Sequence, residues 1–189
     1  PADDKPRRLL YDRRRDRAPS ASFAQVNAEM AEILREYVLD RARSYEPATV
    51  VDAYSGAGHT AIALSREGAT VTAIELDQDA SEWSASKLAE PSRAIRGRVE
   101  EQLPNALPAD LVILNPPRAG VDARVTETLE AEATRLKGLI YISCNPATLA
   151  RDLARLPGYR IESLMAFDMF PQTAHVETVC ELRPAGAAT

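Results

Sequence analysis

The fold is decided by residues 49–77, which read TVVDAYSGAGHTAIALSREGATVTAIELD. The β-branched run at 49–53 predicts a strand, and the glycines that follow it predict a tight turn. Residues 60–66 then predict a short helix, and Gly68 separates that helix from a second strand at 70–76. A strand, a crossover helix and a second strand form a right-handed βαβ unit. This segment therefore predicts an α/β protein with a parallel sheet.

The same alternation continues on both sides of that segment, without internal repeats. Further strands are predicted at 93–96, 110–114 and 139–143, and further helices at 23–43, 79–88, 122–136 and 146–156. The last two predicted strands, 160–167 and 176–183, have no helix between them, which indicates an antiparallel hairpin. We therefore expect a Rossmann-like α/β fold, with a mostly parallel sheet that a hairpin closes.

The composition is that of one soluble globular domain. Of the 189 residues, 45% are hydrophobic and 27% are charged. No apolar run approaches the ~20 residues that span a bilayer. The first residues lack the apolar core of a secretory signal, so the cytoplasm is the expected location. The two cysteines, Cys144 and Cys180, are too few for a disulfide framework or a four-thiolate cluster, and we predict no bound metal.

The charge is unevenly spread along the chain. The formal net charge is -5, which argues mildly against a nucleic-acid partner. Residues 1–18, however, hold seven basic and four acidic side chains, which leaves -8 for the rest. This basic segment can steer toward phosphate or can be a solvated tail, and the sequence favours neither. We expect a basic, flexible arm over 1–21, a single folded domain over 22–184 and a short tail over 185–189.

The glycine turn predicts a ligand site. Gly56 and Gly58 let the backbone approach a ligand closely at the carboxyl end of the first strand. Asp52, just before the turn, can orient the loop and favours a cationic ligand such as a sulfonium over a pyrophosphate. Glu75, at the end of the second strand, is in position to accept both hydroxyls of a ribose. The alternatives are a nicotinamide-cofactor site, which Asp52 disfavours, and a tight turn beside a surface carboxylate.

Two further loops converge on the same edge of the predicted sheet. One reads LNPPRAG at 114–120, where the prolines hold the loop extended and expose the Asn115 amide. The other reads YISCNP at 141–146, where Asn145 can cap a helix that starts at Pro146. Cys144 then lies at the positive end of a helix dipole, which stabilises a thiolate nucleophile. A small buried residue is the alternative for Cys144 and the expected role of Cys180.

The chain resembles the RNA 5-methyluridine methyltransferases. Residues 141–152 (YISCNPATLARD) resemble the nucleophile motif of that family, and residues 168–177 (DMFPQTAHVE) resemble its general-base motif. Residues 23–27 (FAQVN) and 115–120 (NPPRAG) resemble two further motifs of the family. The resemblance implies the methyltransferase version of the fold, with S-adenosylmethionine as cofactor, Cys144 as the nucleophile and Glu177 as the proton acceptor. It also implies cofactor contacts from four side chains: Gln25, Tyr54, Glu75 and Asn115.

The chain departs from the family pattern in five respects. Many members carry Asp at the position of Asn115, and often Asn at the position of His59. Arg98 stands where a polar contact to the adenine is expected. The family usually has an amino-terminal RNA-binding barrel, which residues 1–20 are too few to form. We therefore expect either the catalytic part of a longer protein or a minimal enzyme that relies on its arm or on a partner. The cluster cysteines of some relatives are absent.

The resemblance implies a reaction in which each residue type has a purpose. Carbon-5 of uracil is a weak nucleophile, and addition of a Cys144 thiolate at carbon-6 activates it toward a sulfonium methyl group. Glu177 then removes the carbon-5 proton. The expected substrate is a loop uridine of tRNA or rRNA, because its base is the easiest to extrude, and Phe170 and His175 are candidates to hold it. A small-molecule methyltransferase and a noncatalytic module that binds cofactor or RNA remain as alternatives.

Overall fold

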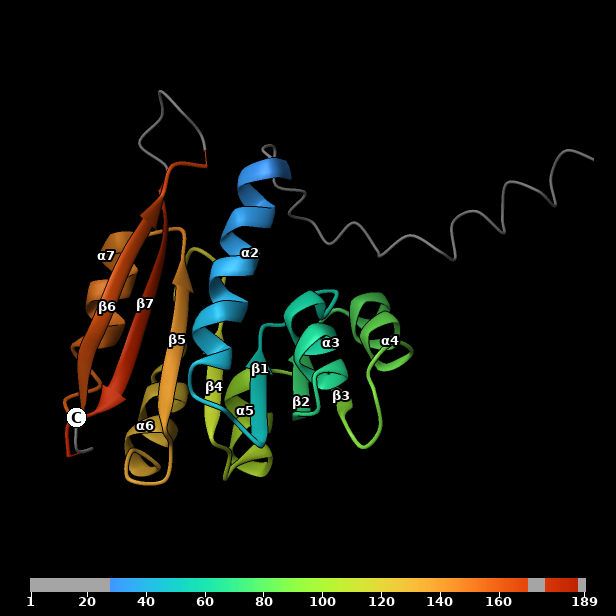
Figure 1. The fold of residues 1–189 in the computed structure, drawn as a ribbon. Coiled ribbons are helices and arrows are strands. Elements are labelled where there is room, and N and C mark those ends of the chain that lie inside the picture. Colours follow the sequence, from blue (N-terminus) through green and yellow to red (C-terminus); the bar gives the residue numbers. More distant parts are fainter. Residues whose placement is uncertain (1–27, 170–175, 187–189) are drawn as a thin grey trace, which may run out of the picture.

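A single mixed sheet organises the computed structural model, which describes residues 28–169 and 176–186 (Figure 1). Its strands lie in the order β3 (Arg93–Arg96), β2 (Thr70–Glu75), β1 (Thr49–Ala53), β4 (Leu111–Leu114), β5 (Gly138–Ser143), β7 (Glu177–Pro184) and β6 (Tyr159–Phe167). Neighbours from β3 to β5 are parallel, whereas β7 runs antiparallel to both β5 and β6. The predicted α/β fold with a closing antiparallel hairpin is confirmed.

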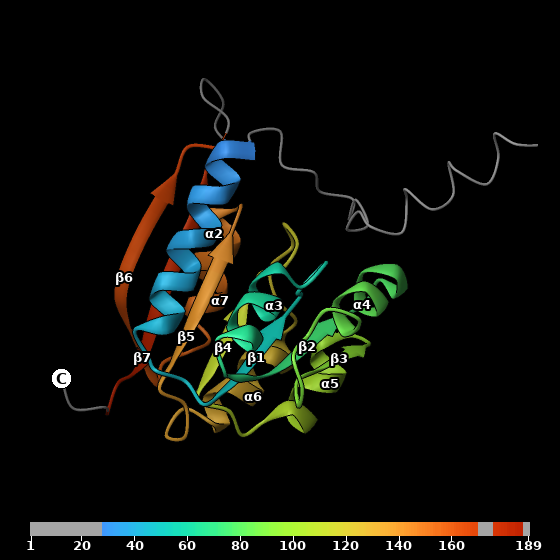
Figure 2. The same ribbon diagram turned by 45° about the vertical axis from the view of Figure 1, so that its right-hand side comes forward.

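Helices cover both faces of this sheet, as Figures 1 and 2 show from two sides. The bounds are α2 (Ala28–Arg43), α3 (His59–Arg66), α4 (Gln78–Ala85), α5 (Val99–Ala106), α6 (Ala123–Ala131) and α7 (Pro146–Leu153). Apolar residues of α2 and α3, such as Val38 and Leu64, pack on the face that carries Ile113 and Ile140. Side chains of α5, α6 and α7 pack on the opposite face. Each strand therefore contributes alternate residues to two cores.

Most predicted elements are present within a few residues of their expected bounds. The helix predicted over 23–43 is observed from Ala28 onward, and its first residues lie outside the described part. The one helix that the sequence did not predict is α5. Val99 and Leu103 are four residues apart, so they lie on one side of α5, and both are buried. The helix forms although Pro104 inside it has no N–H to donate. No helix in the described ranges is long and apolar enough to cross a membrane.

A buried ion pair joins α2 to β7. The Glu181 carboxylate is fully buried and accepts hydrogen bonds from Arg41 Nε at 2.6 Å and from the Tyr45 hydroxyl at 2.9 Å. Burial alone would raise the pKa of Glu181, but the hydrogen bonds from Arg41 and Tyr45 outweigh it and lower that pKa. Because α2 and β7 both contribute walls to the cleft described below, this pair fixes their relative position.

We expect Glu181→Gln to lower the free energy of unfolding by about 3 kcal/mol, the lower end for breaking a buried ion pair, because Arg41 keeps some access to water. Urea unfolding at neutral pH measures the change. Glu162→Gln is the control, since that carboxylate pairs with Arg160 and Arg183 on the exposed side of the hairpin. Equal stability of the two variants would contradict a structural role for the buried pair.

Candidate functional site

A cleft of about 1680 Å³ opens at the carboxyl ends of the parallel strands. The loops that follow β1, β2, β4 and β5 converge there with the first residue of β7. The predicted site residues that line it are Tyr54, Gly56, Glu75, Asn115, Cys144 and Glu177. Gln25, Phe170 and His175 lie outside the described residues. The cleft thus brings together six residues that come from five separate segments of the chain.

The turn after β1 is tightly wound. Tyr54, Gly56 and Gly58 all have positive φ, at 60°, 54° and 74°. Such a conformation is strained for tyrosine, and strain of this kind is concentrated at ligand sites. A Cβ on Gly58 would lie 2.9 Å from the Cβ of Ser84, so Gly58 also permits the close approach of α3 and α4. Gly58 therefore shapes the turn from behind and is not among the described residues that line the cleft.

Asp52 supports the turn from inside the protein. Its side chain is buried, and it accepts a hydrogen bond from the Ala61 N–H in the first turn of α3 at 3.1 Å. Burial raises the pKa of Asp52 to about 7, against the opposing effect of this hydrogen bond, and the nearby charge of Glu75 adds to the rise. The expectation that Asp52 orients the loop agrees with this position. The described lining of the cleft does not include Asp52, so any effect on a cationic ligand is indirect.

Glu75 ties the first two loops together. Its carboxylate accepts hydrogen bonds from the Gly56 N–H at 2.7 Å and the Asp77 N–H at 2.8 Å, one on each oxygen. Asp77 in turn caps α4 by accepting from the Ala80 N–H. A carboxylate has about four acceptor sites, so each oxygen of Glu75 can still accept one hydroxyl from a ligand. The local hydrogen bonds hold the carboxylate at the cleft wall in one orientation.

The proline loop after β4 is held by a residue that the sequence analysis did not single out. Asp152 on α7 is fully buried and accepts from the Val121 N–H at 3.0 Å and the Tyr141 hydroxyl at 2.8 Å. Arg151 donates to the Asp152 carboxylate and also to the Ala119 carbonyl. These bonds join the proline loop to β5 and α7, and leave Asn115 exposed at the cleft. The only signal for Asp152 was an acidic residue on the apolar side of a short helix.

Cys144 and Glu177 meet across the antiparallel pair β5–β7. The last pair of the ladder is Ser143 with Thr178; Cys144 directly follows β5, and Glu177 is the first residue of β7. Side chains alternate between faces along a strand, so Glu177 lies on the face of Val179, toward α2. The sequence had left the direction of Glu177 open, and the structure turns it into the cleft.

The surroundings of the two residues differ. Asn145 caps α7 directly after Cys144, accepting from the Ala147 N–H at 3.0 Å, as the sequence predicted. Cys144 is half-buried. Glu177 is 6% exposed, and burial raises its pKa, while the positive charge of Arg118 opposes the rise. A buried carboxyl beside a cysteine at a helix start provides a base and a nucleophile in one cleft.

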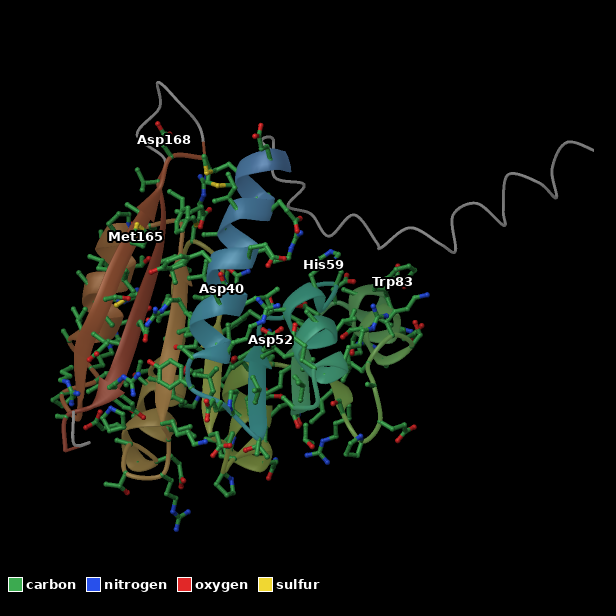
Figure 3. All side chains as sticks on the ribbon, in the orientation of Figure 1. Asp40, Asp52, His59, Trp83, Met165 and Asp168 are labelled. Carbon is green, nitrogen blue, oxygen red and sulfur yellow. The ribbon has the colours of Figure 1, made fainter. Side chains whose placement is uncertain are left out.

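Other predicted features have structural positions as well. Cys180 is fully buried, and burial raises its pKa to about 11, which agrees with the inert role expected for it. His59 begins α3 at the cleft, above Asp52 at the end of β1 in Figure 3. Arg98 also lines the cleft. Within residues 28–169 and 176–186, no group of three His, Cys, Asp or Glu side chains could hold a metal ion.

Comparisons with known proteins give a consistent result. Residues 97–183 match the model of the tRNA (uracil-5-)-methyltransferase family. An uncharacterized RNA methyltransferase of Enterococcus faecalis is 36% identical over 174 residues, which are 87% of this chain and 38% of that protein. One from Gloeobacter violaceus is 40% identical over 180 residues, 92% of this chain and 38% of that protein. The chain therefore spans about two fifths of the length of these relatives.

A solved structure has the same fold and a related sequence. The tRNA (uracil-54, C5)-methyltransferase of Pyrococcus abyssi, solved in complex with S-adenosyl-L-homocysteine, is 31% identical and has a TM-score of 0.70. The match covers 86% of this chain and 40% of that one.

Proposed function

The chain belongs to the RNA (uracil-5-)-methyltransferase family, and on that premise we propose that it methylates carbon-5 of a uridine in RNA with S-adenosylmethionine. The observation that carries the proposal is that Cys144 and Glu177 line one cleft, each next to the last pair of the β5–β7 ladder, Ser143 with Thr178. A methyltransferase acting on a more reactive atom would need neither a nucleophile nor a base of this kind. A nucleophile and a base in one cleft are what methylation needs when the target is a carbon that must first be activated.

The residues that line the cleft after β1, β2 and β4 fit S-adenosylmethionine. Glu75 keeps two acceptor sites for ribose hydroxyls. The positive φ angles of Tyr54 and Gly56 form a tight turn, whose backbone can approach the bound cofactor closely. The exposed Asn115 amide faces the same space. When bound, the cofactor supplies an electrophilic methyl group on a sulfonium. The methyl donor of this family and the demethylated cofactor, S-adenosyl-L-homocysteine, bound by the Pyrococcus abyssi enzyme support this assignment.

The proposed reaction then takes place between Cys144 and Glu177. The Cys144 thiolate adds to carbon-6 of the uracil, and the electron pair of the 5,6 double bond becomes an enolate. Carbon-5 of that enolate attacks the sulfonium methyl group, whose bond to sulfur breaks, so that S-adenosylhomocysteine leaves. Glu177 takes the carbon-5 proton, the double bond re-forms, and Cys144 leaves carbon-6 as a thiolate. Because burial raises the pKa of Glu177, its carboxylate is a stronger base than an exposed one.

The proposed substrate is a loop uridine of tRNA or rRNA. The site lies in a cleft, so the target base has to leave its stack to reach Cys144. The free energy needed for this is smallest when the base is unpaired. The Pyrococcus abyssi enzyme acts on uracil-54 of tRNA, which makes tRNA the first substrate to examine. The activity of the protein as a whole is part of the proposal, because the chain spans two fifths of its relatives.

Nucleoside mass spectrometry tests the function directly. Unmodified tRNA and rRNA are incubated separately with the protein and S-adenosylmethionine, digested, and searched for 5-methyluridine. We expect this nucleoside from at least one RNA. Its absence from both would overturn the proposal and favour one of two alternatives, a small-molecule methyltransferase or a noncatalytic module.

A prediction for the cofactor half rests on Glu75. We expect Glu75→Ala to weaken binding of S-adenosylmethionine by ~1–3 kcal/mol, the cost of losing hydrogen bonds to a charged acceptor. Isothermal calorimetry gives the dissociation constants. The control is Glu82→Ala, an exposed carboxylate on α4 that bonds only to Gln78 among the described residues. Because Glu75 also holds Gly56 and Asp77, thermal melting must show that the variant is folded. An unchanged dissociation constant would remove Glu75 from the site.

A further inference from the structure

The charges along the cleft are sorted into two regions. Three acidic side chains lie where a sulfonium cation is proposed to bind: Glu75 ends β2, Asp77 caps α4 and Asp79 lies on α4. Three arginines lie in the other region: Arg118 on the proline loop, Arg151 on α7 and Arg155 just after the end of α7. The other charged pairs along the cleft neutralise one another: Arg35 with Glu32, Arg98 with Glu100, and Asp122 with Arg124. Glu177 is the remaining acid, with a raised pKa. The α7 side of the cleft therefore carries the surplus of positive charge.

The one buried carboxylate beneath these arginines is already satisfied. Asp152 accepts two hydrogen bonds on Oδ2, from Val121 and Tyr141, and two on Oδ1, from the Nε and Nη2 atoms of Arg151. Four acceptor sites are the capacity of a carboxylate. Arg155 approaches the same Oδ1 only to 3.6 Å, and its side chain is 40% exposed. The guanidinium of Arg155 is thus not required to satisfy Asp152.

Arg118 is held by its backbone, which leaves its side chain available. Its carbonyl accepts from the Thr148 hydroxyl at 3.3 Å and from Asn145 Nδ2 at 3.5 Å, so the start of α7 fixes the position of the residue. In the part of the chain that the structure describes, its guanidinium has no hydrogen bond or ion pair and acts on Glu177 through charge alone. Arg118 thus lies on the Cys144–Glu177 side of the cleft with its donors unused.

We propose that Arg118, Arg151 and Arg155 bind the phosphates that flank the target nucleotide, so that the RNA backbone crosses the cleft along α7. Arg151 lies in α7 and Arg155 follows the end of that helix, but both guanidinium groups approach Oδ1 of Asp152, at 2.8 and 3.6 Å, so they lie close together. Guanidinium groups bind phosphate through paired N–H donors. Arg151 is already held by Asp152 and the Ala119 carbonyl, so it loses little conformational freedom on binding. This basic rim gives a protein of net charge -5 a local surface for a polyanion. The inference rests on the proposed function.

Arg155→Gln is the deciding variant, because Arg155 makes the fewest internal contacts of the three. Binding of a twelve-nucleotide oligouridylate is measured by fluorescence anisotropy over a series of salt concentrations. We expect affinity to fall about three- to tenfold at 0.1 M salt, and the slope of log K against log salt to become shallower by ~0.7, the contribution of one phosphate contact in single strands. Arg155→Lys keeps the charge and should keep most of the slope.

The matched control is Arg135→Gln, an exposed arginine that pairs with Glu132 and does not line the cleft. It should bind oligouridylate like the wild type. An unchanged affinity and salt slope in Arg155→Gln would contradict the proposal that these arginines bind RNA phosphates, even if the wild type makes 5-methyluridine. A loss of affinity in Arg155→Gln, together with no 5-methyluridine from tRNA or rRNA, would support the rim and refute the proposed reaction. Thermal melting of all variants checks that the fold is intact.

Discussion

The Cys144→Ala protein should form no 5-methyluridine and no covalent complex with RNA. The wild type, given cofactor and RNA that carries 5-fluorouridine at the target, should become attached to it, because fluorine cannot leave carbon-5 as a proton does. Denaturing gels detect the complex, and peptide mapping should find it at Cys144. Without the thiolate the uracil is not activated, so we expect turnover below detection.

The second cysteine of the chain provides the control. Cys180→Ala removes a thiol that is fully buried in β7, packs in the core under α5, α6 and α7, and does not line the cleft. It should leave the adduct in place, with at most a loss of stability from the small cavity. Attachment at Cys180, or methylation that persists in Cys144→Ala, would contradict the mechanism.

The Glu177→Gln protein should perform the first half of the reaction and stop. Glutamine preserves the shape and a hydrogen-bonding group but is not a base. The thiolate can still add and the methyl group can still move, which leaves a methylated nucleotide bound to Cys144. Loss of a general base costs ~100- to 10,000-fold in rate, so turnover should nearly cease while this species accumulates. Label from the cofactor's methyl group should migrate with the protein on denaturing gels.

Glu162→Gln, an exposed carboxylate on the neighbouring strand β6, should turn over normally and trap nothing. Near-normal turnover of Glu177→Gln would mean that another group takes the proton. Loss of turnover without a trapped species would assign Glu177 to a step before methyl transfer, such as holding the uracil edge.

The mostly parallel sheet was predictable because the local pattern and the long-range packing agree. The run at 49–53, the glycines after it and the carboxylate at Glu75 specify a βαβ unit with a ligand edge, and the structure has the same strand bounds for β1. The helix α5 was missed because Pro104 argues locally against a helix. Burial of Val99 and Leu103 against the sheet outweighs that local cost, and packing of this kind is invisible in a single sequence.

The sequence singled out six residues that line the cleft, but not the hydrogen bonds that support them. Cys144 and Glu177 follow from motifs, whereas the direction of Glu177 depends on the register between β5 and β7. Asp152 and Tyr141 were inside a quoted motif, yet their hydrogen bond joins residues eleven positions apart through the packing of α7 on β5. The sequence assigned Asp52 both to the orientation of the loop and to the ligand, and its burial beneath α3 supports the first of these roles.

The position of β7 has a consequence for the synthesis of the protein. Of the strands that the structure describes, β7 is the last in the sequence, yet it lies between β5 and β6. Until β7 has emerged from the ribosome, β5 lacks a hydrogen-bonding partner on one edge and β6 lacks its partner strand. The strands β1, β2 and β4, whose loops carry the residues proposed to bind the cofactor, are translated well before β7. A growing chain can therefore form the proposed cofactor site before Glu177 joins Cys144 in the cleft. The proposed chemistry at Cys144 becomes possible only after β7 has been translated and has inserted between β5 and β6.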